Sequence, residues 1–136
     1  MFILIDCNVL IAAALTNGTC RSVLQWALHH HSIILSEDIV LKYGRVCKRD
    51  RFRSFQKELQ ELVTIICQLV ILVDPVETNW VLPDPDALKY IQAGLACREP
   101  VFLLTGNSKD FPQKQYDFIT ILSPYEVYEK WILLGN

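Results

Sequence analysis

The sequence lacks the features that mark membrane proteins and the common nucleotide-binding domains. No apolar run reaches the roughly 18 residues of a membrane-spanning helix, because the longest, 63–73, contains Thr64, Cys67 and Gln68. The start MFILID has no basic residue before its first acid, so we do not expect a signal peptide. No GxGxxG or GxxxxGK[ST] phosphate loop occurs, which counts against a small nucleotide-binding or phosphoacceptor domain.

Paired cysteines are also missing. The five cysteines are odd in number and widely spaced, and none forms a CxxC motif, so we expect neither a disulfide framework nor a zinc site. Buried, reduced thiols are typical of cytoplasmic proteins. We therefore expect a cytoplasmic protein without membrane association.

An excess of positive charge is missing too, since the formal net charge is −2. The whole chain therefore has no field that would attract nucleic acid. One segment is nevertheless dense in basic residues, and local positive charge can bind phosphates. The alternative is a solvated face without a ligand. The predicted RNA-binding residues of this segment are Lys42, Arg45, Lys48, Arg49 and Arg51.

Short apolar runs alternate with amphipathic segments along the 136 residues, which we interpret as one domain spanning 1–136. The runs predict strands at 2–5, 33–35, 70–73, 101–105 and 118–122. Helices are expected at 8–15 and 20–30, from 37, at 52–69, from 84 or 86 to about 98, and from 124, with N-caps at Thr19, Ser36 and Ser123. This order predicts a three-layer α/β/α fold with a central, mostly parallel five-stranded sheet.

Oxygen-bearing side chains follow several of the predicted strands. Asp6 follows the first strand, Asp84 and Asp86 precede a helix, and Asn107 and Asp110 follow the fourth strand. Ligands of such sheets bind beyond the carboxyl ends of the strands, and clustered carboxylates suit Mg²⁺ or Mn²⁺. Such an ion could activate water for phosphodiester hydrolysis.

Each of these residues also has a purely structural explanation. Asp6 with Asn8 could cap a helix, and Asp84-Pro85-Asp86 is a common turn and cap sequence. Asn107 and Asp110 are ordinary turn residues after a glycine. His29-His30-His31 is expected at a helix end, where three consecutive side chains cannot all face one metal ion.

Four segments together resemble the PIN-domain family of ribonucleases, in order along nearly the whole chain: ILIDCNVLIAA (3–13), ILSEDIVLKYGRV (34–46), LPDPDALKYIQAGLACREPVFLLTGNSKDFP (82–112) and TILSPYEVYEKW (120–131). The branch they resemble most contains VapC-related toxin components of toxin–antitoxin pairs. The resemblance implies a PIN-like fold and a Mg²⁺- or Mn²⁺-dependent endoribonuclease with three or four acids at the metal.

The resemblance assigns roles to individual residues. Asp6 matches the first acid, Asn8 the residue that steadies it, and Thr105 the residue before the last acidic loop. Asn107 stands where an aspartate is common, and Asp110 matches the second acid of that loop. We expect catalysis by Asp6, Asp86 and Asp110, a metal site of Asp6, Asp84, Asp86, Asn107 and Asp110, and support from Asn8 and Thr105.

Two positions depart from the family pattern. Lys42 stands where the family has a glutamate, and Ala87 where it has an acid at the start of a helix, although Asp86 adjoins it. We expect the Lys42 ammonium to neutralise Asp6, take the place of a cation and weaken Mg²⁺ binding. The alternative function is therefore a catalytically degenerate PIN-like domain that binds protein or RNA. Expected partners are RNA, an antitoxin protein and a second copy of the chain, paired through helices around 19–30 and 55–66.

Overall fold

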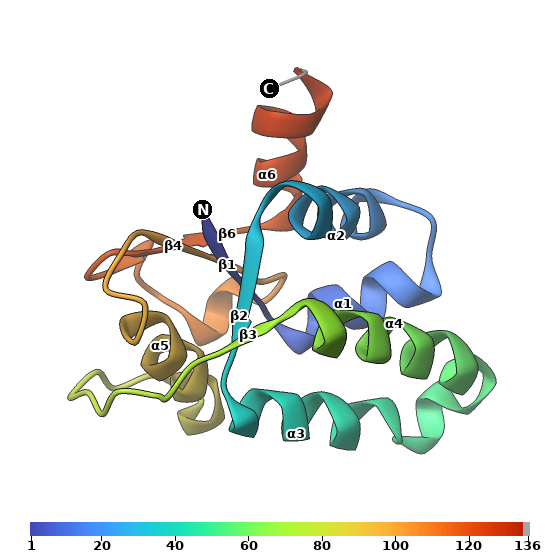
Figure 1. Ribbon diagram of the computed structural model, residues 1–136, viewed down its shortest axis with the longest axis horizontal. Helices are drawn as coiled ribbons and strands as arrows, with labels where there is room; N and C mark the ends of the chain where they lie inside the picture. Colours follow the sequence, from blue (N-terminus) through green and yellow to red (C-terminus); the bar gives the residue numbers. More distant parts are fainter. Residues whose placement is uncertain (135–136) are drawn as a thin grey trace.

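The computed structural model describes residues 1–134 and shows a mixed α/β fold with a mostly parallel sheet flanked by helices (Figure 1). The N-terminal half alternates strands with helix pairs. Its elements are β1 (Phe2–Ile5), α1 (Cys7–Leu15), α2 (Thr19–His30), β2 (Ser32–Leu35), α3 (Glu37–Cys47), the 3₁₀-helix η1 (Asp50–Phe55), α4 (Gln56–Leu69) and β3 (Ile71–Leu72).

A long loop after β3 leads into the C-terminal half, which completes the sheet. Its elements are the 3₁₀-helix η2 (Pro85–Ala87), α5 (Leu88–Leu95), β4 (Val101–Leu104), the 3₁₀-helix η3 (Ser108–Asp110), β5 (Gln115–Tyr116), β6 (Ile119–Leu122), α6 (Pro124–Val127) and the π-helix η4 (Tyr128–Leu133).

The sheet has six strands in the order β3-β2-β1-β4-β6-β5, and only the β5–β6 pair is antiparallel. The prediction of a mostly parallel sheet is confirmed, but the predicted number of five strands is wrong. The additional strand, β5, has two residues, too few for a recognisable apolar run. Because β1, β2, β4 and β6 are parallel, the loops that follow them meet at one edge of the sheet.

Helices cover both faces of the sheet, as predicted. In Figure 1, α5 lies on one side, and α1, α2 and α4 lie on the other. Close packing on the first side depends on Gly94 of α5, because a Cβ atom at this position would lie 2.6 Å from Ile119 Cδ1 and 3.3 Å from Leu4 Cδ1. On the second side, Phe102 packs against Trp131, which stacks on Trp26.

Several predicted helix boundaries differ from the structure. The helix predicted over 52–69 is a 3₁₀-helix followed by α4, and the one predicted from 84 or 86 to about 98 is η2 followed by the shorter α5. Thr19 lies inside α2 and Gly18 is the N-cap, so the predicted Thr19 cap is wrong. The caps at Ser36 and Ser123 are confirmed, the second as a full capping box with Glu126.

The cysteines are all free, as predicted. Cys7 and Cys47 are buried, Cys20 and Cys97 are half-buried, and only Cys67 on α4 is exposed. Burial raises the pKa of all five thiols above the ordinary value of 9.0. In the described part of the chain, no helix has both the length and the apolar character needed to span a membrane.

Candidate functional site

Asp6 lies at the carboxyl end of β1, where its backbone N–H donates to the Leu104 carbonyl of β4 at 2.9 Å. It occupies the N-cap position of α1, but its side chain caps no backbone N–H. The carboxylate instead accepts hydrogen bonds at Oδ2 from the Thr105 hydroxyl at 2.7 Å and from Asn8 Nδ2 at 3.3 Å. With 6% of its surface exposed, Asp6 is a buried carboxylate in a fixed orientation.

Asn8 and Thr105 tie the loops after β1 and β4 together. Asn8 Oδ1 accepts from the Gly106 N–H at 3.1 Å, and Thr105 Oγ1 accepts from the Asn107 N–H at 3.0 Å. The structure thus brings both predicted supporting residues into direct contact with Asp6. The contacts span 99 positions between Thr105 and Asp6, so only the resemblance to a family could have paired these residues from the sequence.

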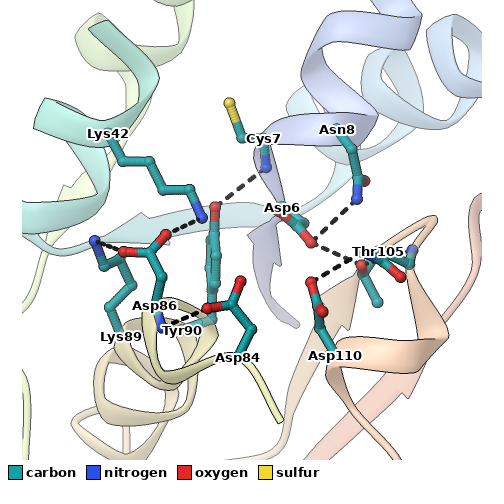
Figure 2. A network of polar contacts seen from close by, with 11 residues as sticks. Asp6, Cys7, Asn8, Lys42, Asp84, Asp86, Lys89, Tyr90, Thr105 and Asp110 are labelled. Atoms are coloured by element: carbon teal, nitrogen blue, oxygen red, sulfur yellow. Dashed lines mark hydrogen bonds and ion pairs between the residues drawn. The ribbon is translucent and has the colours of Figure 1, made fainter. Parts of the chain in front are cut away.

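The loop after β4 also carries Asn107 and Asp110. Asn107 Nδ2 donates to Asp110 Oδ2 at 3.0 Å. Burial raises the pKa of Asp110, and the nearby negative charges of Asp84 and Asp6 raise it further. Figure 2 shows the Asp110 carboxylate on the side of the loop that faces Asp6 and Asp84. Three loops therefore bring these three carboxylates into one region.

Asp84 and Asp86 differ in what they contact. Asp84 Oδ1 accepts from the Asp86 N–H at 3.0 Å, so the predicted capping role of Asp84 is confirmed. Asp86 forms two ion pairs of 2.7 Å, from Oδ2 to Lys42 Nζ and from Oδ1 to Lys89 Nζ. Hydrogen bonds from the two ammonium groups lower the pKa of Asp86 to about 2. We call Asp6, Asp84, Asp86 and Asp110 the acidic rim.

Lys42 is the main difference between the expected and the observed site. The sequence predicts an ion pair between Lys42 and Asp6, whereas the ammonium pairs with Asp86 and lies 5.1 Å from the centre of the Tyr90 ring (Figure 2). The reason is that this side chain of α3 extends toward η2 and α5 rather than toward β1. Asp6 is consequently left without a directly paired cation among residues 1–134.

Sequence reasoning missed two residues of the site, Lys89 and Tyr90. Lys89 follows Asp86 by three positions, which is a spacing that favours ion pairs at a helix start. The Tyr90 hydroxyl accepts from the Cys7 N–H at 3.1 Å. Tyr90 thereby anchors Cys7, the residue after Asp6. Burial raises the pKa of the Cys7 thiol to about 12.

The other predicted RNA-binding residues lie in the last turn of α3 and in the segment that follows it. Lys42 belongs to α3, and Arg45 follows it on the same helix. The side chains beyond are exposed, and Arg51 lies over the Phe52 ring at 4.7 Å. These exposed basic residues are Arg45, Lys48, Arg49 and Arg51.

The three histidines lie at the end of α2 and the start of β2, away from the rim. His31 packs against Trp26, with ring centroids 4.4 Å apart. In the described residues 1–134, no three His, Cys, Asp or Glu side chains are close enough together to hold one metal ion. This finding covers the acidic rim as well as the histidines.

The observed architecture is PIN-like, with a mostly parallel sheet flanked by helices and acidic loops at the carboxyl ends of its strands. Among solved structures, the chain is similar to VapBC2 from Rickettsia felis, crystallised with a DNA fragment from its promoter. The TM-score is 0.61 at 14% sequence identity, and the alignment covers 90% of this chain and 98% of that one. This likeness concerns the fold alone. No protein-family model and no curated protein matches the sequence.

Proposed function

We propose that the chain is a PIN-type endoribonuclease that depends on Mg²⁺ or Mn²⁺ and hydrolyses RNA phosphodiesters in the cytoplasm. The observation that carries the proposal is the orientation of Asp6 by Thr105 and Asn8 beside the carboxylates of Asp84 and Asp110. The negative charges of Asp84 and Asp6 raise the pKa of Asp110, and a cation bound among these carboxylates would relieve their repulsion.

The donor chemistry of the rim fits a hard divalent cation. Mg²⁺ usually binds proteins through only one or two carboxylates and keeps waters and substrate phosphates as its other ligands. Asp6 and Asp110 would hold the ion, with Asp84 and Asn107 beside them. When bound, such a cation supplies charge to neutralise the phosphate and acidity to activate a water. Asp86 as a metal ligand stays a prediction, because both of its oxygens contact lysines.

The protein's own residues would orient and steer the substrate. Thr105 and Asn8 donate to one oxygen of Asp6 and so fix the direction of the other. The exposed basic residues from Arg45 to Arg51 would attract RNA through its phosphates. Lys42 would attract RNA phosphates at the acidic rim itself.

Cleavage of single-stranded RNA with and without Mg²⁺ or Mn²⁺ tests this function. We expect cation-dependent cleavage that Asp6→Asn abolishes. The matched control is Asp74→Asn, which removes the same charge from an exposed loop residue outside the rim. Equal activity of wild type and Asp6→Asn would contradict the proposal.

The second candidate is a PIN-like domain that binds RNA or protein without cutting it. The ion pairs of Asp86 with Lys42 and Lys89 favour it, because they occupy one of the four carboxylates. Under this alternative, the wild type does not cleave RNA, and the double variant Lys42→Glu with Ala87→Asp gains cleavage. Cleavage by the wild type would rule the alternative out.

A protein partner is the third part of the proposal. One structural neighbour is an assembly named VapBC2, bound to promoter DNA, and we propose that this chain is the toxin of such a pair. Expression together with the product of an adjacent small reading frame is expected to yield a stable complex and to relieve toxicity. If expression of the chain is equally harmless to the cells with and without that product, the proposed toxin role is contradicted.

A further inference from the structure

Two lysines share one carboxylate inside the acidic rim. The Nζ atoms of Lys42 and Lys89 each lie 2.7 Å from a different oxygen of Asp86. Each lysine side chain is 17% exposed, whereas that of Asp86 is 47% exposed. Figure 2 shows the two lysines approaching Asp86 from α3 and α5. The ammonium groups are therefore held on largely buried stems at the edge of the rim.

This cluster is positively charged within an otherwise acidic region. Two ammonium groups and one carboxylate leave one positive charge. The Tyr90 ring below Lys42 limits where its ammonium can lie. A fixed ammonium beside carboxylates is suited to hold a phosphate, because charges on a transferring phosphoryl group are stabilised by lysines and cations together.

We propose that Lys42 and Lys89 form a phosphate-binding site that positions the RNA backbone against the acidic rim. When RNA is absent, the Asp86 carboxylate occupies both ammonium groups and competes with a phosphate for them. The inference rests on the proposed ribonuclease function, and it identifies a backbone phosphate as the group that these lysines bind. It also explains why a lysine is compatible with nuclease chemistry at position 42.

Binding of a non-cleavable single-stranded 2′-O-methyl RNA, measured by fluorescence anisotropy in Mg²⁺ buffer over a range of salt, tests the proposal. We expect Lys42→Gln and Lys89→Gln each to weaken binding about tenfold. Each should also reduce the slope of the logarithm of the binding constant against the logarithm of salt concentration by about one. Lys42→Arg keeps the charge and should retain binding. Lys57→Gln on α4 removes an equal charge outside the rim and should leave the affinity unchanged.

Asp86→Asn should change the RNA affinity in the opposite direction from the lysine variants. This variant therefore distinguishes a binding role of the two lysines from a purely structural role of their ion pairs. Removing the competing carboxylate should maintain or tighten RNA binding, even though it breaks the same two ion pairs. Weakening as large as that of the lysine variants would overturn the proposal and identify Asp86 as a ligand of the cation. Unchanged binding by both lysine variants, or no binding by the wild type, would also overturn it.

Cleavage assays on the same variants distinguish this proposal from the proposed function. Lysine-dependent binding without any cleavage by the wild type would refute the ribonuclease function and leave the phosphate site standing. Cleavage of RNA that both lysine variants bind as tightly as the wild type would refute the phosphate site alone.

Discussion

At the scale of single residues, two aspartates of the acidic rim have pKa values shifted in opposite directions. Lys42 and Lys89 lower the pKa of Asp86 to about 2. Burial and the charges of Asp84 and Asp6 raise the pKa of Asp110. The first shift means that the ionised carboxylate favours the folded state, and the second means that it opposes it.

The Asp86 ion pairs should make the free energy of unfolding depend on pH in the acidic range. Because the folded pKa of about 2 lies below the ordinary 3.8, their contribution is complete above pH 4 and is lost as the pH falls toward 2. Thermal unfolding of wild type and Asp86→Asn between pH 2 and 5 should show a gap that narrows with acidification. A gap that stays constant would contradict the ion pairs.

Asp110→Asn should stabilise the protein at neutral pH, whereas Asp86→Asn should destabilise it. A raised pKa means that ionised Asp110 costs stability at neutral pH, and this cost disappears as the pH falls below that pKa. We expect the variant to unfold at a higher temperature than the wild type at pH 7 and not at low pH. Added Mg²⁺ or Mn²⁺ should stabilise the wild type more than the variant, and equal responses would speak against a cation at Asp110.

The residues of the site were only partly predictable from the sequence. Motif order placed Asp6, Asn8 and Thr105 correctly at one edge, because the ends of parallel strands meet there. The partner of Lys42 was not predictable, since a long flexible side chain can reach carboxylates on several elements. Lys89 and Tyr90 were missed because their importance depends on where α5 packs.

At the scale of the elements, α5 packs against the sheet more closely than any side chain at Gly94 permits. A methyl group there would meet Ile119 at 2.6 and 2.9 Å. Gly94→Ala should therefore destabilise the protein by about 1–3 kcal/mol through overpacking, despite the better helix propensity of alanine. Chemical denaturation measures this effect.

Gly44→Ala is the matched control in α3. Apart from its chain neighbours and the backbone of α3, no atom lies within 4 Å of the position its methyl group would take, so only the helix propensity changes. We expect stabilisation by roughly 0.5–1 kcal/mol. Similar effects of both substitutions would contradict the packing of α5 on β6.

Element type was easier to predict from the sequence than element length. Apolar runs and capping residues identify the helices and five of the six strands, because these signals are local. The two-residue β5 and the 3₁₀ turns η1 and η2 leave no periodic pattern. Their presence depends on tertiary packing, which a single sequence does not display.

At the scale of the whole molecule, Ile65 and Leu69 of α4 are exposed apolar side chains, and Leu28 of α2 is half-buried beside them. A hollow of about 320 Å³ between these helices is lined in part by Leu28, Leu62 and Ile65, within the ranges predicted to pair two copies. Light scattering is expected to show a dimer that Ile65→Lys converts to a monomer, while the adjacent Thr64→Lys has no such effect. A wild type that is monomeric at all concentrations would refute this pairing.

The fold as a whole was predictable because the alternation of buried strands and amphipathic helices runs through the entire chain. Such a pattern permits few arrangements other than a mostly parallel sheet with helices on both faces. The charge balance of the rim was less predictable, since it arises from lysines on two different helices that meet only in the folded molecule.

The burial of the cysteines has a practical consequence for handling the protein. Thiolates, not thiols, react with oxygen-derived oxidants and alkylating reagents, and all five thiols are held in the protonated form at neutral pH. The four buried or half-buried thiols, Cys7, Cys20, Cys47 and Cys97, should therefore resist oxidation in air. A maleimide dye should label Cys67 first, giving a spectroscopic reporter on α4 that leaves Cys7 beside the rim untouched.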